Sequence, residues 1–318
     1  MTALSFILVG MLFTAASPFP TTTDERNYTT LPEPGICGIS VADRIIGGKK
    51  TAINAYPWAA LMGVPASASP REIQFLCGGS LISEQFVLSA AHCFILIDPD
   101  VHDIVVRLGE WDIESDVDCI GIICADKPMD FYIELYQLHE SFDPAWNLND
   151  VALMKLPRPV GFTEFISPVC LPLSEDLQEK PKIGRIFTVI GWGNTGRVAD
   201  KTPFYGSRYK KETRIPVTDS ETCGSYRTIS SSEFCAENST DSQSCKGDSG
   251  GPVVAAENDG YWYQYGIVSW GSPCGGMFGN GNESAFGVFV RVSSFLPWIM
   301  KTMRQLGDTS TAGPTDVE

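Results

Sequence analysis

The sequence predicts an all-β fold assembled from many short strands. Four runs rich in β-branched and aromatic residues carry this prediction: Gln85–Ser89, Asp103–Leu108, Ile186–Ile190 and Tyr265–Trp270. Residues typical of turns separate the runs, and such alternation is typical of a β-barrel or a β-sandwich. The chain has 318 residues. Because all-β folds often extend over about 200–250 residues as one unit, one β domain can account for most of it.

The chain begins with an apolar run, Leu4–Phe13, followed by the small residues Thr14, Ala15 and Ala16. This order is typical of a secretory signal peptide, although no Lys or Arg precedes the run. A membrane anchor is the alternative, but the run is shorter than the roughly 20 apolar residues that a spanning helix needs. We therefore expect a signal peptide over residues 1–16 and export of the remainder.

Residues 17–44 are rich in Pro and Thr and show little periodicity, which favours an extended propeptide over a domain. This segment ends at Arg44, directly before the run Ile45–Gly48. Near the other end of the chain, Phe295–Leu306 carries apolar residues at helical spacing and predicts a helix. The polar residues 307–318 are expected to be disordered.

The composition already restricts the function. A formal net charge of −15 argues against nucleic-acid binding, because phosphate contacts require a basic surface. The ten cysteines agree with export, because disulfides persist in an oxidising compartment. Their spacing alone does not define which cysteines are paired.

Three short motifs point to nucleophilic catalysis. They are Ala90-Ala91-His92-Cys93, Asn149-Asp150-Val151-Ala152-Leu153 and Gly247-Asp248-Ser249-Gly250-Gly251-Pro252. A serine hydroxyl is a weak nucleophile at neutral pH, so it needs a general base, and that base needs an orienting partner. Together the motifs resemble those of the chymotrypsin/trypsin family of serine endopeptidases, and the resemblance extends from about Ile45 to about Leu306.

This resemblance implies two six-stranded antiparallel β-barrels with a C-terminal helix, in a protease domain over residues 45–306. It implies that Ser249 is the nucleophile, that His92 is the general base and then the general acid, and that Asp150 orients the imidazole. The backbone N–H groups of Gly247 and Ser249 would form the oxyanion hole. Purely structural roles are the alternative, which the matching motifs and their order disfavour.

The resemblance also implies a zymogen. Cleavage after Arg44 would free the α-amino group of Ile45, which would enter the body of the protein. There it would pair with Asp248, because a buried carboxylate needs a charged partner. An ordinary basic turn at Arg44 is the alternative.

Four disulfides are suggested by the resemblance, and one of them would tether the propeptide to the protease. The suggested pairs are Cys37–Cys170, Cys77–Cys93, Cys223–Cys235 and Cys245–Cys274. Cys119 and Cys124 are then left over, and we pair them by elimination. A zinc site at these two residues is the alternative, but no nearby Cys or His cluster completes a tetrahedral set.

The substrate pocket lacks an acidic residue at the positions where trypsin-like members carry one. Gln243 stands six residues before Ser249, and Gly287 stands on the opposite wall. A buried Arg or Lys that faces an amide keeps much of its desolvation cost. We therefore expect weak cleavage after basic residues and a preference for a neutral or aromatic side chain. Asp241 is the alternative acidic partner.

Ser269, Trp270 and Gly271 resemble the family's edge strand, to which an extended substrate adds its backbone. Gly271 and Gly287 would leave the pocket open to a large side chain. Because this pocket does not suit Arg, cleavage after Arg44 should require a separate trypsin-like activating protease.

An acidic loop surrounds Cys119. Trypsin-like enzymes often bind calcium in the corresponding loop, so Glu110 and Asp112 are candidate calcium ligands, and a solvated acidic loop is the alternative. The loop with its local cysteine pair resembles that of arthropod clip-type haemolymph proteases. Residues 17–44 hold only one cysteine, so no clip domain is expected. The N-glycosylation pattern occurs at Asn27, Asn238 and Asn282.

These observations predict a secreted serine endopeptidase that performs limited proteolysis in an extracellular cascade of the immune or clotting kind. The expected partners are protein substrates, an upstream activating protease and serpin-type inhibitors, with no nucleic acid and no membrane. No cofactor is required apart from the candidate structural calcium. A digestive or venom protease is one alternative, and a catalytically weak homologue that acts as a binding or cofactor protein is another.

Overall fold

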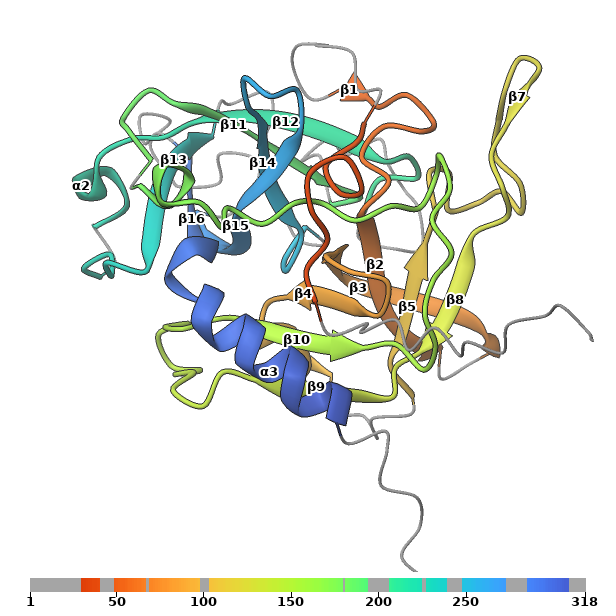
Figure 1. The fold of residues 1–318 in the computed structure, drawn as a ribbon, viewed down its shortest axis with the longest axis horizontal. Coiled ribbons are helices and arrows are strands. Elements are labelled where there is room, and N and C mark those ends of the chain that lie inside the picture. Colours follow the sequence, from red (N-terminus) through yellow and green to blue (C-terminus); the bar gives the residue numbers. More distant parts are fainter. Residues whose placement is uncertain are drawn as a thin grey trace, which may run out of the picture.

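The computed structural model describes residues 30–40, 49–66, 69–97, 103–179, 181–193, 206–224, 227–238, 248–272 and 285–308. Within these residues the chain folds into two curled antiparallel sheets, and a helix near the C-terminus packs along one side (Figure 1). The prediction of an all-β fold with a C-terminal helix is therefore confirmed. The predicted strands at 85–89, 103–108, 186–190 and 265–270 all lie within or overlap observed strands.

The N-terminal sheet contains seven strands in the order β8-β5-β2-β3-β4-β10-β9. Their bounds are β2 Ala59–Ala66, β3 Ser69–Leu81, β4 Phe86–Ser89, β5 Val105–Leu108, β8 Met129–Tyr132, β9 Leu135–Leu138 and β10 Ala152–Lys155. β8 and β9 lie at opposite edges, yet only Ile133 and Glu134 separate them along the chain. This stretch therefore joins the two edges and closes the sheet. Counted as one strand, it gives the six-stranded barrel that the resemblance implied.

The C-terminal sheet has the order β1-β12-β11-β14-β15-β16-β13. Its bounds are β1 Lys49–Lys50, β11 Ile186–Gly191, β12 Lys211–Pro216, β13 Glu233–Asn238, β14 Pro252–Ala256, β15 Trp262–Gly271 and β16 Ala285–Arg291. Val217, directly after β12, forms an isolated bridge with Ala236 of β13 and so joins the ends of a six-stranded set. The two-residue β1 adds a seventh strand beside β12. A separate hairpin contains β6 Cys119–Ile120 and β7 Ile123–Cys124.

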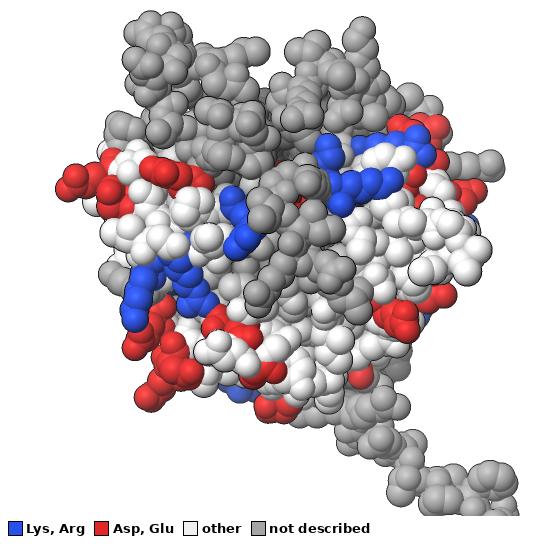
Figure 2. Space-filling model, turned by 90° about the horizontal axis from the view of Figure 1, so that it is seen from above, with Lys and Arg blue, Asp and Glu red and all other residues white. Residues whose placement is uncertain are grey.

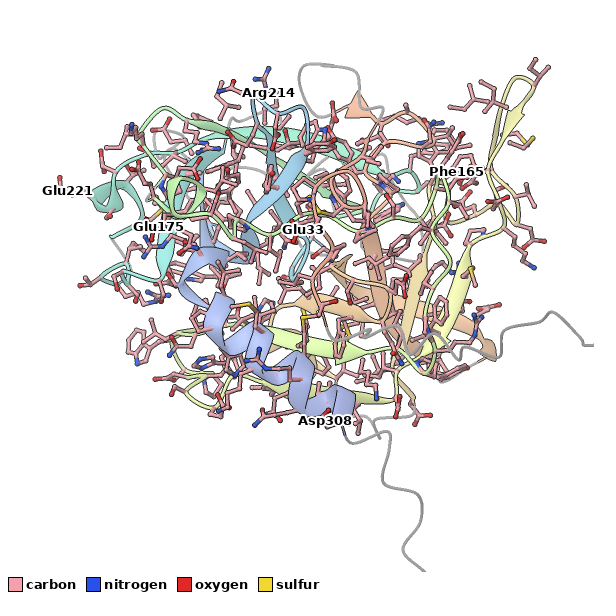
Figure 3. All side chains as sticks on the ribbon, in the orientation of Figure 1. Glu33, Phe165, Glu175, Arg214, Glu221 and Asp308 are labelled. Carbon is pink, nitrogen blue, oxygen red and sulfur yellow. A yellow bond between two sulfur atoms is a disulfide. The ribbon has the colours of Figure 1, made fainter. Side chains whose placement is uncertain are left out.

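The helical elements are α1 His92–Leu96, α2 Ser220–Cys223 and α3 Leu296–Asp308, with the 3-10 turns η2 Glu175–Gln178 and η3 Val292–Ser294. The predicted C-terminal helix is thus present, and it continues two residues past Leu306 to Asp308, which Figure 3 labels at its end. Trp298 anchors α3, because its Nε1 donates to Glu140 Oε2 at 2.8 Å. Among the described residues, no helix has both the length and the apolar character to cross a membrane.

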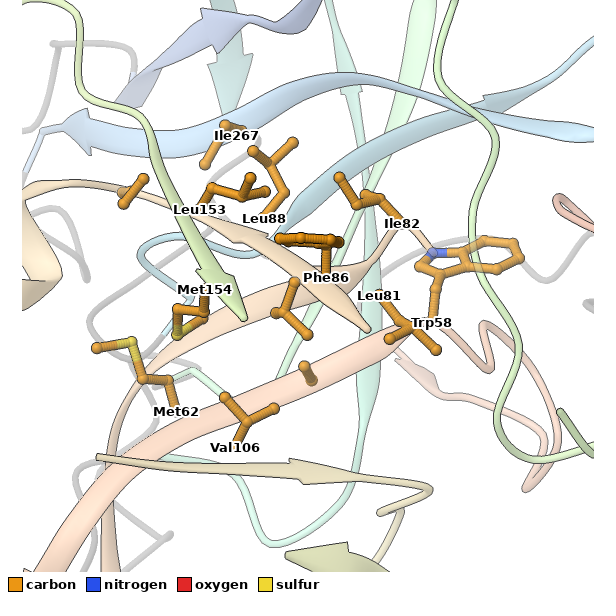
Figure 4. Packing of buried hydrophobic residues seen from close by; sticks show 14 of the residues in the cluster. Trp58, Met62, Leu81, Ile82, Phe86, Leu88, Val106, Leu153, Met154 and Ile267 are labelled. Atoms are coloured by element: carbon orange, nitrogen blue, oxygen red, sulfur yellow. The ribbon is translucent and has the colours of Figure 1, made fainter. Parts of the chain in front are cut away.

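The largest hydrophobic cluster fills the first barrel and reaches the second, and another cluster fills the second barrel. Trp58, Phe86 and Leu88 from the first barrel are fully buried and belong to one cluster with Ile267 of β15 (Figure 4). Burial of such large apolar side chains stabilises the fold and holds the two barrels in a defined relation. Loops from both barrels can therefore meet along this junction in a reproducible geometry.

The segment 30–40 lies against both barrels. Cys37 is bonded to Cys170, and Figure 3 places Glu33 over the middle of the body. Gly38 donates its N–H to the Pro168 carbonyl at 2.9 Å, and its own carbonyl accepts from the Trp262 N–H at 2.9 Å. Backbone hydrogen bonds as well as the disulfide therefore hold this part of the predicted propeptide.

Candidate active site

His92 and Asp150 lie side by side because β4 pairs with β10. Ser89, which ends β4, is paired with Ala152, which begins β10, and the two candidate residues lie a few positions beyond these partners. One oxygen of Asp150 accepts from the His92 backbone N–H at 2.8 Å, and the other lies 2.7 Å from His92 Nδ1. Asp150 is fully buried, so its carboxylate can orient the imidazole.

A third group on Asp150 comes from the second barrel. Ser269 of β15 donates its hydroxyl to Asp150 Oδ2 at 2.5 Å, and Ser269 is itself buried. Both carboxylate oxygens therefore accept hydrogen bonds, which offsets the cost of burying a charge. The contact joins the two barrels at the candidate site.

Ser249 lies on a sharp turn that packs against the first barrel. The Gly78 N–H donates to the Ser249 carbonyl at 2.7 Å. Gly250 has a φ of +78°, and a Cβ at this position would lie 2.6 Å from the Gly78 carbonyl oxygen and 3.1 Å from the Ala90 nitrogen. Only glycine fits such a close approach. Because Ala90 is two residues before His92, the turn brings Ser249 to the segment that carries the candidate base.

The described part of the site contains no hydrogen bond between His92 and the Ser249 hydroxyl. A serine hydroxyl rotates about its Cα–Cβ bond, and catalytic hydrogen bonds in unliganded enzymes often tighten only when substrate binds. The structure thus shows the imidazole oriented by Asp150.

Asp248, the predicted acceptor of the new N-terminus, is seated on a glycine-lined surface. Its Oδ1 accepts from the Gly193 N–H at 2.7 Å. A Cβ on Gly193 would lie 2.3 Å from Asp248 Oδ2, and a Cβ on Gly191 would lie 2.2 Å from Oδ1. The two glycines therefore create the space that the carboxylate occupies. Sequence reasoning missed both of them, although the Gly191-Trp192-Gly193 spacing is a visible signal.

The predicted substrate-binding residues of β15 and β16 lie at one end of their shared ladder. Gly271 is paired with Gly287, and a Cβ on Gly271 would lie 2.6 Å from the Phe286 carbonyl oxygen. Trp270 is half-buried, with its ring edge-on to Phe286 at a centroid distance of 6.0 Å. The backbone at Gly271 and Gly287 and the Trp270 indole therefore lie together at this end of the ladder.

Four of the five predicted disulfides are present in the structure: Cys37–Cys170, Cys77–Cys93, Cys119–Cys124 and Cys223–Cys235. Within the described residues, Cys77, His92 and Cys93 bring their ligand atoms close together. Both sulfurs belong to a disulfide, so they are not available to a metal.

Several predicted site residues lie outside the described residues. They are Asn27, Arg44 and Ile45, then Asp241, Gln243, Cys245 and Gly247, and finally Cys274 and Asn282. Asn238, the remaining glycosylation candidate, ends β13 opposite Ala285.

Asp112, one of the two candidate calcium ligands, is engaged in an ion pair. Its two oxygens accept from Arg208 Nε and Nη2 at 2.6 and 2.8 Å. Arg208 also lies 2.7 Å from Glu114. On the face shown in Figure 2, basic side chains likewise lie beside acidic ones in small groups. The Asp112 carboxylate therefore already has a cationic partner and fits calcium poorly.

Glu110 and Asp118, like Asp112, are buried carboxylates of this loop. Burial raises the pKa of Glu110 to about 7 and also raises the pKa of Asp118. Asp118 Oδ2 accepts from the N–H groups of Trp111 and Asp112, both at 3.1 Å, whereas Oδ1 has no hydrogen-bond partner in the described structure. Burial lowers the pKa of the nearby Lys210 to about 8. A buried carboxylate oxygen without a donor is a feature that a cation would satisfy.

Comparison with known proteins agrees with this geometry. The family model described as Trypsin matches residues 45–299. The chain is 38% identical to Serine protease 7 of Drosophila melanogaster, over 86% of this chain and 69% of that protein. It is 35% identical to Phenoloxidase-activating factor 3 of Holotrichia diomphalia, over 87% of this chain and 77% of that protein.

A solved structure is similar in fold as well. The crystal structure of the Drosophila Grass clip serine protease of the Toll pathway aligns with a TM-score of 0.70 and 30% identity, over 88% of this chain and 76% of that chain. The CLIP domain-containing serine protease HP8 of Bombyx mori is 35% identical, over 89% of this chain and 76% of that protein. The chain therefore belongs to the trypsin family of serine proteases.

Proposed function

We propose that this chain is a secreted serine endopeptidase that is made as a zymogen and activated by cleavage after Arg44. The contact between His92 and Asp150, which Ser269 completes, carries the proposal, because it builds the orienting half of a Ser-His-Asp site. The family membership and the motif around Ser249 support the remainder.

In the proposed reaction, Ser249 Oγ attacks the carbonyl carbon of the scissile peptide bond while His92 Nε2 takes the hydroxyl proton. The backbone N–H groups of Gly247 and Ser249 stabilise the negative oxygen of the tetrahedral intermediate. His92 then donates the proton to the leaving amine as the C–N bond breaks, and an acyl-enzyme remains on Ser249. A water molecule, deprotonated by the same imidazole, hydrolyses this ester and restores the serine. Asp150 stays ionised and stabilises the imidazolium.

Activation would act through Asp248. The new ammonium group of Ile45 would bind the carboxylate that Gly191 and Gly193 accommodate. Pairing a buried carboxylate with a charged partner removes much of its desolvation cost. Cys37–Cys170 would keep the propeptide attached after cleavage.

We infer that the pocket prefers a neutral or aromatic residue, because Gln243 and Gly287 provide no charge opposite a substrate Arg or Lys. Such a pocket would not process Arg44, so a separate trypsin-like protease would activate the chain. The similarity to a phenoloxidase-activating factor and to a clip protease of the Toll pathway supports limited proteolysis in an extracellular cascade. Glycosylation at Asn27, Asn238 or Asn282 and inhibition by serpin-type proteins would be consistent with export.

For calcium, we propose Glu110 and Asp118 as the carboxylate ligands, in place of Glu110 and Asp112. The proposal is supported by the burial of both carboxylates and by the partnerless Asp118 Oδ1 in the described structure. Glu110 already pairs with Arg107 at 3.2 Å, so the partnerless Asp118 Oδ1 is the atom in the described structure that a divalent cation would satisfy. The role would be to stabilise the loop, and the reaction needs no metal.

Labelling with a fluorophosphonate tests the catalytic proposal. The zymogen is cleaved with a trypsin-like protease, and modification is mapped by mass spectrometry, with Ser249→Ala as the control. We expect modification of Ser249 only after cleavage. A folded and cleaved protein that remains unmodified would instead support a catalytically weak homologue that acts as a binding protein.

Incubation of the pure zymogen alone tests the need for a separate activator. We expect no cleavage after Arg44 under these conditions. Cleavage at Arg44 that disappears in the Ser249→Ala variant would show self-activation and overturn the inference about the pocket.

A further inference from the structure

We propose that Arg227 is a positioning residue, which holds Trp270 in place as a wall of the substrate cleft and so determines how well extended peptides bind. This inference rests on the proposed peptidase function and deepens it. Arg227 lies in no catalytic motif, and the case for it comes from its contacts.

Arg227 is stacked on the Trp270 indole. The guanidinium carbon lies 4.7 Å from the centre of the ring, which is within the range of a cation–π contact. The same indole and the Phe286 ring form a T-shaped pair. Contacts with Arg227 and Phe286 therefore restrict the rotation of this side chain.

Arg227 is itself held by Glu233, the first residue of β13. Arg227 Nη2 donates to Glu233 Oε1 at 2.5 Å, and Nη1 donates to Oε2 at 2.8 Å. Only 11% of the Arg227 side chain and 2% of the Glu233 side chain are exposed, and Glu233 Oε2 also accepts from the Ser230 N–H at 2.9 Å. A two-pronged pair of this kind fixes the plane of the guanidinium, which a lysine ammonium cannot reproduce.

Trp270 adjoins the candidate site along the chain of β15. Trp270 directly follows Ser269, whose hydroxyl is bonded to Asp150. The ladder between β14 and β15 ends at the pair Pro252↔Ile267, whereas β15 continues to Gly271 with β16 on its other side. The last residues of β15 therefore extend past β14. An extended peptide that pairs with β15 on the side of β14 would pass Trp270.

The substrate class follows from this placement. A peptide long enough to pair with β15 would set a side chain against the indole, and an apolar side chain would bury the most surface there. A single-residue ester would occupy only the pocket beside Ser249 and would not reach the indole. Arg227 should therefore matter for extended peptides with an apolar residue at that position and be irrelevant for short esters.

The first test compares Arg227→Lys with a matched control, Arg185→Lys. Arg185 also stacks on an aromatic ring, 4.3 Å from the centre of Tyr265, and also pairs with a glutamate, Glu257. With activated protein, Arg227→Lys should raise KM for the extended apolar peptide about 5- to 10-fold, the range expected for losing one stacked cation. Its kcat/KM for a single-residue ester should stay unchanged, and Arg185→Lys should affect neither substrate.

The second test does not depend on activity. Protein labelled with 5-fluorotryptophan is studied by fluorine NMR, with Trp270→Phe used to assign the Trp270 resonance. Arg227→Lys should shift or broaden this resonance, whereas Arg185→Lys should leave it in place.

An unchanged resonance, or equal losses on the ester and the peptide, would overturn the assignment of Arg227. If the activated wild type hydrolyses neither substrate, the proposed peptidase function fails. The fluorine spectrum would then still decide whether Arg227 holds Trp270.

Discussion

Replacing Gly193 with alanine should disable the site without changing any side chain of the proposed triad. The added Cβ would lie 2.3 Å from Asp248 Oδ2, 2.4 Å from Cγ and 2.6 Å from Oδ1. These distances are far below van der Waals contact, and the atoms involved belong to a short, buried side chain. The Asp248 carboxylate must therefore move away from Gly193.

The size of the effect follows from the interaction that is lost. Displacement breaks the hydrogen bond from the Gly193 N–H to Asp248 Oδ1, which is 2.7 Å long. A hydrogen bond to a charged group contributes about 1.5–3 kcal/mol. Since 1.4 kcal/mol corresponds to a factor of ten, molecules with Asp248 in this seat should become about 10- to 150-fold less populated.

The assay measures the second-order rate of fluorophosphonate labelling after cleavage at Arg44, together with kcat/KM on a short ester. Gly161→Ala is the matched control, because a Cβ at that position would meet no atom within 4 Å. Thermal unfolding confirms that both variants are folded. A Gly193→Ala protein that labels within about twofold of the wild type would refute the proposed role of the glycine-lined seat.

Three further predictions concern the triad, the acidic loop and α3. Asp150→Asn should lower kcat by about four orders of magnitude, because the imidazole would be held in the wrong tautomer, and a loss below tenfold in steady-state kinetics would contradict this. Asp118→Asn should abolish any calcium-dependent rise in Tm measured by scanning fluorimetry, whereas Asp112→Asn should preserve that rise. The reverse result would favour Glu110 and Asp112 as the calcium ligands. Burial against Phe295 and Trp298 lowers the pKa of His139 below 6.5, because burial disfavours the charged imidazole. The neutral imidazole therefore contributes fully to the stability of the fold above pH 6.5. This contribution is lost as the pH falls below 6.5 toward the lower pKa that His139 has in the folded protein. His139→Gln should therefore lose less stability than the wild type between pH 7.5 and 5 in thermal unfolding, and parallel profiles would argue against this.

Sequence reasoning succeeded where a local pattern has one structural meaning. The strand runs Phe86–Ser89 and Ile186–Gly191 were predictable from composition. Three of the four disulfides in the described structure followed from the family resemblance, and Cys119–Cys124 followed by elimination. The contact between His92 and Asp150 depends on the pairing of β4 with β10, which no local pattern reveals. Only the family motif made that pair predictable.

The sequence alone does not distinguish acidic residues that differ only in their tertiary partners. Asp112 and Asp118 are equally acidic in the sequence and both are buried, yet Asp118 accepts from two backbone N–H groups whereas Asp112 pairs with Arg208. The role of Arg227 was equally hidden, because its partners Glu233 and Trp270 are brought to it by the second barrel. Such choices depend on tertiary neighbours, so neither charge nor spacing along the chain could have settled them.

The backbone bonds of Gly38 have a practical consequence for anyone who produces this protein. A recombinant protein that started at Ile45 would lack Cys37, so Cys170 would be left as a free thiol that can form wrong disulfides. The Pro168 carbonyl and the Trp262 N–H would also lose their hydrogen bonds to Gly38. The stretch upstream of the proposed cleavage site is thus part of the folded scaffold. Expression should retain it and cut the folded precursor afterwards.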